Sequence, residues 1–257
     1  MNVGIMGCNG RVGQLLIEEL LSGDWNAQDL TLAGGCARSG TDVAGDYFIT
    51  EDKEELFKRS DVIIDFTLPE GIKEHTKLAV LHKTALVVGT TGLGEDDEDD
   101  LKNASEHVPI VYAANMSIGV NMLLALVEKT AARLESEWDI EIFESHHKYK
   151  VDAPSGTALA LGKAAAAGRG NNLENLAEYS RHGQIGAREK GKIGFSVARG
   201  GDVVGEHTVF FFGDGERLEL SHKATNRSLF AKGALRAASW TKEKEAGLYS
   251  MRDVLDL

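Results

Sequence analysis

The chain has 257 residues, 42% of them apolar, which suits a globular protein of one large or two modest domains. Its formal net charge is −12, whereas nucleic-acid-binding proteins normally carry a basic surplus, so we expect no nucleic-acid partner. Cys8 and Cys36 lack metal-ligand spacing and predict reduced thiols in a cytoplasmic protein. No apolar run reaches the roughly 18 residues of a membrane span, and residues 1–7 do not resemble a secretory signal, so we expect neither.

The N-terminus begins with a predicted buried strand at residues 2–6, a glycine-rich turn, and a helix over residues 14–21. Gly7, Gly10 and Gly13 are spaced three apart, and Asn9 stands where the commonest dinucleotide fingerprint has its second glycine. Such glycines allow a tight turn and let a pyrophosphate approach the N-terminus of the helix. The pattern predicts a dinucleotide-binding unit, although a purely structural glycine turn is the plainer alternative.

The second predicted strand, residues 30–34, is followed by Ala37 and Arg38. In NAD enzymes an acidic side chain near this place binds the adenosine ribose, whereas an arginine receives the extra phosphate of NADP. Alanine followed by arginine therefore favours NADPH, with NADH possible. A solvent-facing loop arginine would give the same sequence.

Further strands are predicted at residues 61–66, 85–88 and 108–114, with helices over residues 71–82 and from residue 95. Strands that alternate with helices predict an α/β fold with a Rossmann-like, doubly wound parallel sheet. The turn Gly89, Thr90, Thr91 follows one strand directly, at the carboxyl end where ligands bind in open α/β sheets.

The second half of the chain predicts a separate α+β domain with an open mixed sheet. A helix over residues 118–134 precedes strands near residues 139–144, 195–198, 199–212 and 216–222, and an amphipathic helix at 230–240 returns to the first domain. We expect residues 1–117 and 227–257 to form the dinucleotide-binding domain, and residues 118–226 the substrate-binding and oligomerisation domain. An uncovered sheet surface is a liability that oligomer formation removes. The stretch 168–194 is long for a structureless loop and predicts a functional or mobile excursion.

The most informative stretch follows the strand at residues 139–144. His146, His147 and Lys150 lie within five positions, and Ser155 is placed to cap a new helix. Cationic side chains that face a helix N-terminus predict a site for a small, multiply charged carboxylate. A solvated basic loop before an ordinary helix start is the alternative.

This stretch, H-H-K-Y-K-V-D-A-P-S-G-T-A at residues 146–158, resembles the signature of the 4-hydroxy-tetrahydrodipicolinate reductase (dihydrodipicolinate reductase) family. Similar blocks run in order from residue 3 to residue 255: G-C-N-G-R-V-G at 7–13, D-F-T-L-P at 65–69, A-A-N-M-S-I-G-V-N at 113–121 and R-G-G-D-V-V-G-E-H-T at 199–208. The chain departs from the family at Val12, at Met116, and at Ala37, where relatives often have an acidic residue.

The resemblance implies a cytoplasmic homotetramer that uses NADPH or NADH to reduce 4-hydroxy-tetrahydrodipicolinate, a small cyclic dicarboxylate in the diaminopimelate branch of lysine biosynthesis, to tetrahydrodipicolinate. By position it makes His146 the proton donor, Lys150 its electrostatic partner, and His147, Gly156 and Thr157 substrate-binding residues. No metal is expected. The implied cofactor-binding residues are Gly7, Cys8, Asn9, Gly10, Arg11, Val12, Arg38, Gly89, Thr90, Thr91, Ala113, Ala114, Asn115 and Met116.

Other functions fit the residues less well. A serine hydrolase built on Ser155, His146 and Asp152 lacks the G-x-S-x-G elbow and leaves the glycine turn unexplained. A zinc site at His146 and His147 lacks a third ligand at the usual spacing. A related NAD(P)-dependent amino-acid dehydrogenase and a non-catalytic dinucleotide-sensing regulator stay open, although the complete His and Lys cluster argues against the regulator.

Overall fold

The computed structural model describes residues 1–38, 40, 45–134 and 136–257, which divide into two compact units. Unit 1 consists of Met1–Ile118 and Ser228–Leu257, and unit 2 consists of Gly119–Arg227. The functions predicted for these two parts of the chain stay predictions at this point. Within the described ranges, no helix has both the length and the apolar character that a membrane crossing requires.

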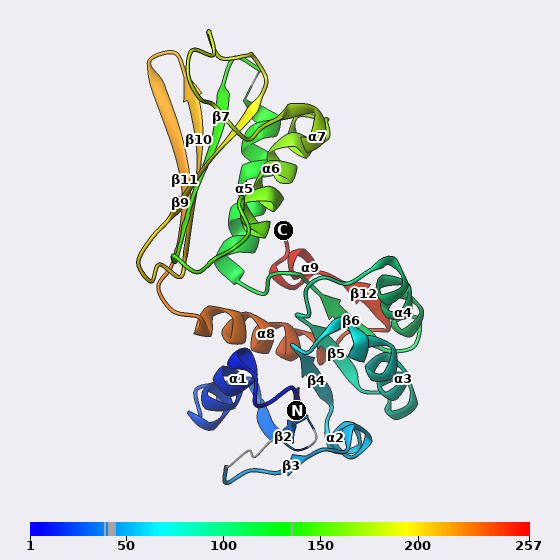
Figure 1. The fold of residues 1–257 in the computed structure, drawn as a ribbon. Coiled ribbons are helices and arrows are strands. Elements are labelled where there is room, and N and C mark those ends of the chain that lie inside the picture. Colours follow the sequence, from blue (N-terminus) through cyan, green and yellow to red (C-terminus); the bar gives the residue numbers. More distant parts are fainter. Residues whose placement is uncertain (39, 41–44, 135) are drawn as a thin grey trace. The chain divides into compact units, whose positions relative to one another are not determined.

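Unit 1 is built on a parallel sheet (Figure 1). Its strands are β1 Asn2–Met6, β2 Thr31–Cys36, β3 Ile49–Thr50, β4 Val62–Asp65, β5 Ala85–Val88, β6 Pro109–Tyr112 and β12 Gly247–Tyr249. They lie in the order β12-β6-β5-β4-β1-β2-β3, and every adjacent pair is parallel. The predicted doubly wound parallel sheet is confirmed. The short strand β3 and the C-terminal strand β12 were not anticipated.

Helices cover both faces of this sheet, which is why its central strands are apolar at successive positions. The helices are α1 Arg11–Leu21, α2 Lys53–Arg59, α3 Ile72–His82, α4 Glu95–Ser105, α8 Ser228–Thr241 and α9 Met251–Leu255, with 3₁₀ turns η1 Asn26–Gln28 and η2 Pro69–Gly71. Ile5 belongs to a core with residues of α1 and α8, whereas Met6 belongs to a core with residues of α2, α3 and α4. Neighbouring positions of β1 therefore point into two different cores.

Helix α8 confirms that the chain returns to the first unit after leaving unit 2. It packs on α1 and over strands β4, β5 and β6 (Figure 1). Gly233 makes the close approach possible, because a Cβ atom there would lie 1.7 Å from the carbonyl oxygen of Met116. The C-terminal segment is thus part of the core of unit 1.

Unit 2 combines a mixed sheet with three helices. Its strands are β7 Asp139–His146, β8 Ala177–Glu178, β9 Ile193–Arg199, β10 Gly205–Gly213 and β11 Glu216–Ala224, and its helices are α5 Ile118–Arg133, α6 Gly156–Gly168 and α7 Leu173–Leu176. The strand order is β11-β10-β7-β9-β8. Strand β7 is antiparallel to β10 and parallel to β9, so the predicted open mixed sheet is confirmed.

The two faces of this sheet differ in their surroundings. Ile140 and Ile142 of β7 are buried in a core with residues of α5 and α6, which lie along one face (Figure 1). On the other face Phe143 is 40% exposed, and Phe210 stacks on Phe212 with 5.6 Å between ring centroids. We call the α5/α6 side the inner face and the side of these phenylalanines the outer face.

The stretch predicted as a loop or excursion contains helix α7 and strand β8, and two arginines join its remainder to strand β7. Arg181 donates hydrogen bonds to both carboxylate oxygens of Glu141, each at 2.8 Å. Arg188 bonds Asp139 at 2.8 Å and Glu141 at 3.0 Å. The segment is therefore attached to β7 by charge-assisted hydrogen bonds.

The contact of Gly233 with Met116 yields a stability prediction. Gly233→Ala should lower the free energy of unfolding by about 1–3 kcal/mol, because the added methyl group overpacks the contact of α8 with Met116. This cost exceeds the stability gained from the higher helix propensity of alanine. Urea unfolding followed by circular dichroism measures the change. Arg236→Ala, at an exposed position of α8, is the control and should shift the value by less than about 0.5 kcal/mol. Equal stability of the two variants would contradict the packing argument.

Candidate active site

The glycine turn forms a backbone cradle at the start of α1. Gly7 has φ +70°, a conformation that side chains disfavour, and a Cβ atom at Gly13 would lie 2.3 Å from the carbonyl oxygen of Gly7. Gly10 caps α1 without any side-chain hydrogen bond. The first N–H groups of the helix therefore need acceptors from elsewhere, and a phosphate group supplies such oxygens.

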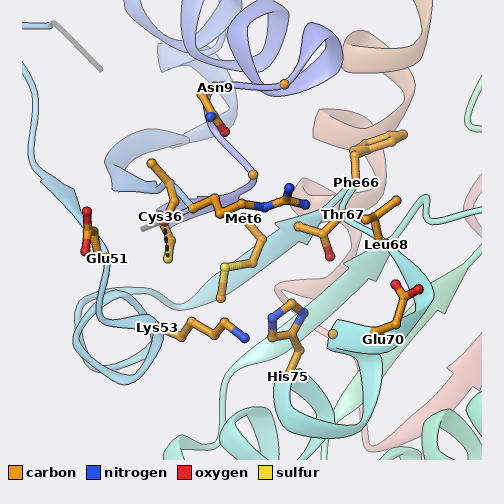
Figure 2. Close-up of a pocket in the computed structure, with 15 residues that line it drawn as sticks. Met6, Asn9, Cys36, Glu51, Lys53, Phe66, Thr67, Leu68, Glu70 and His75 are labelled. Carbon is orange, nitrogen blue, oxygen red and sulfur yellow. Dashed lines mark hydrogen bonds between the residues drawn. The ribbon is translucent and has the colours of Figure 1, made fainter. Parts of the chain in front are cut away.

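A cavity of about 700 Å³ lies beside this cradle, where strands β1, β2 and β4 end (Figure 2). It is lined by Met6, Gly7, Asn9, Gly10, Cys36, Ala37, Arg38, Glu51, Lys53, Phe66, Thr67, Leu68, Glu70, Gly71 and His75. Four predicted cofactor residues are among them: Gly7, Asn9, Gly10 and Arg38. The size and the carboxyl-end position suit one part of a dinucleotide.

The other predicted cofactor residues do not line this cavity. Cys8 and Met116 are buried in the core of unit 1, so their side chains do not face a ligand. The remaining ones are Arg11 and Val12 in α1, Gly89, Thr90 and Thr91 after β5, and Ala113, Ala114 and Asn115 after β6. Since β5 and β6 are parallel to β4, the last two groups follow strands at the same edge of the sheet.

Thr90 offers an additional test of whether this edge suits a cofactor. The residue is 2% exposed, and within the part of the chain that the structure describes its hydroxyl oxygen has no hydrogen-bond partner. Buried hydroxyl groups are normally paired, so an unsatisfied one calls for a missing donor or acceptor. A polar group of a bound dinucleotide would fit it.

Asp65 organises a part of the cavity wall that the sequence analysis did not assign. The carboxylate is fully buried, and its Oδ1 accepts hydrogen bonds from the N–H and hydroxyl groups of Thr67 at 2.8 and 2.6 Å. Its Oδ2 lies 2.6 Å from Nδ1 of His75. Burial raises the pKa of Asp65, but hydrogen bonds from His75 and Thr67 and the charge of His75 lower it below the ordinary value overall. The D-F-T-L-P motif at a strand end was the available signal.

Charged side chains of both signs lie near the C-terminal end of β2. Arg38 and Lys53 line the cavity together with Glu51, and Lys53 forms an ion pair with Glu74. Lys53 lies at the start of α2, a helix that the sequence analysis did not predict, which is why this cation was missed. Arg38 and Lys53 can both contact a phosphate group, and Glu51 and Glu74 offset part of their positive charge.

In unit 2, the inner face of β7 changes from apolar to charged along the strand. Ile140 and Ile142 pack in the core, and Glu144 and His146 follow on the same face with 1% and 8% exposure. The register places His207 of β10 opposite Glu144 and Arg199 of β9 opposite His146. Three neighbouring strands thus bring four ionisable groups together at the carboxyl end of β7.

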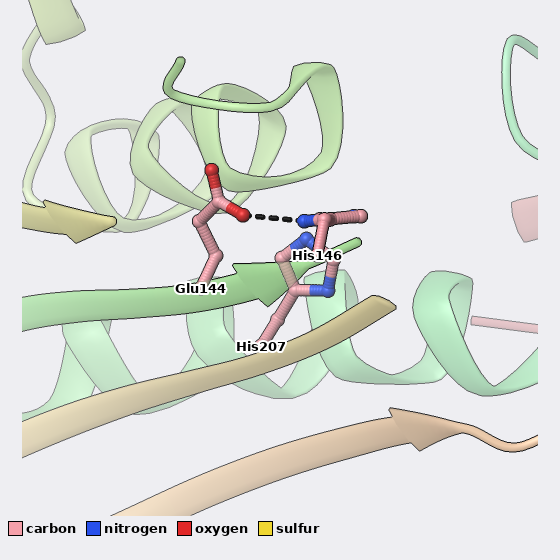
Figure 3. A group of neighbouring side chains, drawn as sticks. All are labelled: Glu144, His146 and His207. Carbon is pink, nitrogen blue, oxygen red and sulfur yellow. Dashed lines mark hydrogen bonds and ion pairs between the residues drawn. The ribbon is translucent and has the colours of Figure 1, made fainter. Parts of the chain in front are cut away.

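Glu144 lies at the centre of this cluster, and Figure 3 shows its contact with His146. One oxygen, Oε2, hydrogen-bonds Nδ1 of His146 and Nη1 of Arg199, the latter at 2.8 Å. The other, Oε1, accepts from Nη2 of Arg199 at 2.9 Å and from the N–H of Ser155 at 3.0 Å. Burial raises the pKa of Glu144, but the hydrogen bonds of Arg199, His146 and Ser155 lower it overall, so the carboxylate is ionised.

The two histidines of the cluster differ in their surroundings. Their rings meet edge to face, with 5.1 Å between centroids, and Nε2 of His207 lies 3.1 Å from the hydroxyl oxygen of Ser155. Burial, assisted by the charge of His146, lowers the pKa of His207 to about 4, so this ring is neutral near pH 7. Burial is also the largest influence on His146 and lowers its pKa overall, although the bond and the charge of Glu144 oppose this. His146 is therefore the ring better suited to take up a proton.

The sequence alone offered no third ligand for a metal site. In the fold, ligand atoms of Glu144, His146 and His207 lie within 4.8 Å of one another (Figure 3). A cation at this place would compete with Arg199, whose guanidinium bonds both oxygens of Glu144. Desolvated like charges at such a distance repel strongly. The cluster therefore fits a hydrogen-bonded network better than a metal centre.

Helix α6 brings its N-terminus to this cluster, as predicted. Ser155 is the N-cap residue, and its hydroxyl accepts from the N–H of Ala158 at 3.2 Å. Beyond its chain neighbours and the backbone of its own helix, no atom of the described residues lies within 4 Å of the position that a Cβ atom of Gly156 would take. A ligand can therefore approach the first turn of α6, which also contains Thr157. Lys150 bonds Asp152 at 2.7 Å, and its charge lowers the pKa of His146.

His147 completes the predicted substrate residues. Its Nδ1 atom is buried and has no hydrogen-bond partner in the ranges that the structure describes. A buried ring nitrogen without a partner is suited to a ligand that supplies a hydrogen-bonding group. The assignment of His147, Gly156 and Thr157 to a substrate nevertheless stays a prediction.

Both units match one family of proteins. Residues 1–116 match the dihydrodipicolinate reductase N-terminus, and residues 119–255 match the dihydrodipicolinate reductase C-terminus. The 4-hydroxy-tetrahydrodipicolinate reductase of Zymomonas mobilis subsp. mobilis is 47% identical over 257 residues, which cover 100% of this chain and 98% of that protein. The chain belongs to the dihydrodipicolinate reductase family. The family resemblance stated from the motifs is confirmed.

Other relatives agree with this assignment. The protein of the same name from Pseudoalteromonas translucida is 46% identical over 265 residues, covering 99% of this chain and 98% of that one. A dipicolinate-bound dihydrodipicolinate reductase from Paenisporosarcina sp. TG-14 has the same fold, with a TM-score of 0.79, 23% identity and 97% of each chain covered. A probable dehydrogenase from Thermotoga maritima is a more distant match, with a TM-score of 0.55, 13% identity and 99% and 92% coverage. That likeness concerns the fold alone.

The burial of His207 predicts a pH dependence of stability. Its pKa falls from 6.5 to about 4 on folding, so the unfolded chain binds more protons between these values. The contribution to stability is complete above pH 6.5 and is lost as the pH falls towards 4, by at most about 3 kcal/mol. Urea unfolding at several pH values should show a smaller slope between pH 4 and 6.5 for His207→Gln than for the wild type. Equal slopes would contradict the neutral, buried state of His207.

Proposed function

We propose that the protein reduces 4-hydroxy-tetrahydrodipicolinate to tetrahydrodipicolinate with a reduced nicotinamide cofactor, in the diaminopimelate branch of lysine biosynthesis. In the balanced reaction the ring loses its hydroxyl group as water, and one hydride and one proton add to the resulting double bond. The nicotinamide, when bound, supplies the hydride. The side chains of this chain bind the ring carboxylates and deliver the proton.

The observation that carries the proposal is the setting of His146. Its Nδ1 is bound to the buried carboxylate of Glu144, and the same carboxylate accepts a hydrogen bond from the N–H of Ser155 at the start of α6. When hydride adds to a double bond conjugated with a ring imine, the neighbouring carbon becomes electron-rich and must take a proton. An imidazolium held in a fixed direction is a suitable acid for that step near neutral pH.

The first turn of α6 is the proposed carboxylate site. Backbone N–H groups at Gly156 and Thr157 lie where the helix dipole favours an anion, and Lys150 and His147 add polar side chains. The Paenisporosarcina relative was solved with bound dipicolinate, which is a ring dicarboxylate of similar size. The same chemistry in this chain supports a small cyclic dicarboxylate as substrate.

Two further parts of the proposal concern assembly and location. The phenylalanines on the outer face of the unit 2 sheet, Phe143, Phe210 and Phe212, form an exposed aromatic surface that association would cover. We expect a homotetramer formed through this face. Cys8 and Cys36 are free and buried, which supports a cytoplasmic location.

The direct test of the function is oxidation of NADPH or NADH, followed at 340 nm, in the presence of freshly generated 4-hydroxy-tetrahydrodipicolinate. His146→Gln should lower kcat by about 10²–10⁴ while leaving cofactor binding unchanged, because only proton delivery is lost. His182→Gln, at an exposed position of unit 2, is the matched control and should keep the wild-type rate. A wild-type rate in His146→Gln would remove His146 from the reaction.

The proposed cofactor is NADPH, with NADH accepted less well. Arg38 and Lys53 supply positive charge near the end of β2, and Ala37 removes the acidic side chain that would bind a free ribose and repel a phosphate. Glu51 also lines the cavity and weakens this field. A modest preference for NADPH is therefore more consistent with the site than exclusive use of NADPH.

Cofactor titrations test this preference without catalysis. Arg38→Ala should weaken NADPH binding several-fold, about 1 kcal/mol, and leave NADH binding unchanged, because only NADPH carries the extra phosphate. Ala37→Glu should weaken NADPH binding in the same way. Arg59→Ala serves as the control, because Arg59 lies in the neighbouring helix α2 over the ring of Phe48 and does not line the cavity. Equal losses for both cofactors in Arg38→Ala would contradict the assignment.

A further inference from the structure

We propose that Glu144 is a positioning residue of the reductase, which fixes the ring of the proton donor His146 and the first turn of the carboxylate-binding helix α6 in one geometry. The inference rests on the proposed function, since it concerns the same reaction. It assigns a role to a side chain that the sequence analysis treated only as the end of a strand.

The contacts of Glu144 account for both of its carboxylate oxygens. Oε2 bonds Nδ1 of His146 and Nη1 of Arg199, and Oε1 bonds Nη2 of Arg199 and the N–H of Ser155. Arg199 also donates to the carbonyl oxygen of Asp152 at 2.6 Å. One ion pair between buried Glu144 and half-buried Arg199 therefore joins the end of β7, the turn at Asp152 and the N-cap of α6.

This arrangement selects which nitrogen of His146 exchanges protons with a substrate. An ionised carboxylate only accepts hydrogen bonds, so Nδ1 of His146 carries the hydrogen. The other nitrogen, Nε2, then gains and releases the catalytic proton. A Cβ atom at Gly205 would approach this nitrogen within 2.9 Å, so the glycine leaves room for it on the side of β10.

The charged groups around His146 come from several elements. Glu144 is on its own strand, Arg199 on β9, His207 on β10 and Lys150 in the following turn. Burial lowers the pKa of His146 below its ordinary value overall. The charges of Lys150 and Arg199 act in the same direction, and the bond and the charge of Glu144 oppose them. Neutralising Glu144 removes that opposing effect, so the ring should lose its proton at a lower pH.

Glu144→Gln tests the role through kinetics as a function of pH. We expect kcat to fall by about 10²-fold, as for a misplaced catalytic group, and the alkaline limb of kcat/KM against pH to move to lower pH. Glu144→Asp, which keeps the charge, should restore the position of the limb and part of the rate. Glu141→Gln is the matched control, because Glu141 is on the same strand, faces away from His146 and also pairs with two arginines.

A second variant separates positioning from folding. Glu144→Gln leaves the guanidinium of Arg199 without its carboxylate in a partly buried place, which destabilises the fold. Glu144→Gln/Arg199→Met removes both charges and should regain stability, while kcat stays low. The limb should stay below its wild-type position but move less than in Glu144→Gln, because Arg199 itself lowers the pKa of His146. If Glu144→Gln does not fold, this double variant and Glu144→Asp decide the question.

The possible outcomes distinguish a failure of the positioning role of Glu144 from a failure of the proposed function. If the wild type does not oxidise NADPH or NADH with this substrate, the proposed function fails. If the wild type is active and the double variant keeps its kcat and an unshifted limb, the positioning role of Glu144 is refuted while the function stands. Loss of rate with a shifted limb in both Glu144→Gln and the double variant supports the role.

Discussion

The pairing of buried Glu144 with half-buried Arg199 is the interaction on which the proposed site depends. Taking a carboxylate and a guanidinium out of water is costly, and the cost is offset only where the geometry is good and the remaining hydrogen bonds are made. Here both oxygens of Glu144 are engaged, with His146 and the N-cap residue Ser155 among their partners, and Arg199 extends the pair to the carbonyl oxygen of Asp152. The hydrogen bonds between Glu144 and its partners thus orient the proposed proton donor His146.

Unit 1 uses a similar device. Asp65 ends strand β4, is fully buried, and holds Thr67 and His75 at the wall of the cavity. In both units, therefore, a strand that is apolar along its buried face carries a buried carboxylate at or near its C-terminal end, and that carboxylate fixes neighbouring side chains. Side chains fixed in this way need little rearrangement when a ligand binds, which favours affinity and rate.

Much of the architecture could be predicted because the signals were local. The parallel sheet followed from alternating strands and helices, and helix α6 followed from Ser155 and a helix-forming composition. The cluster was harder to predict, because Glu144, Arg199 and His207 are far apart in the sequence and meet only through strand register. One local signal was available: Phe143 and Glu144 invert the polar-out, apolar-in alternation of β7, so a charge occupies an inner position. Lys53 was missed because α2 is too short to show a clear periodicity.

The protonation state of His146 provides the most direct measurement. Protein labelled with ¹⁵N in histidine alone should show, near pH 8, a His146 ring protonated at Nδ1, with a proton signal far downfield because it is bound to a carboxylate. In Glu144→Gln this downfield signal should disappear, and the ring should titrate at lower pH than in the wild type. A wild-type His146 protonated at Nε2, or one whose spectrum and titration do not change in Glu144→Gln, would contradict the account.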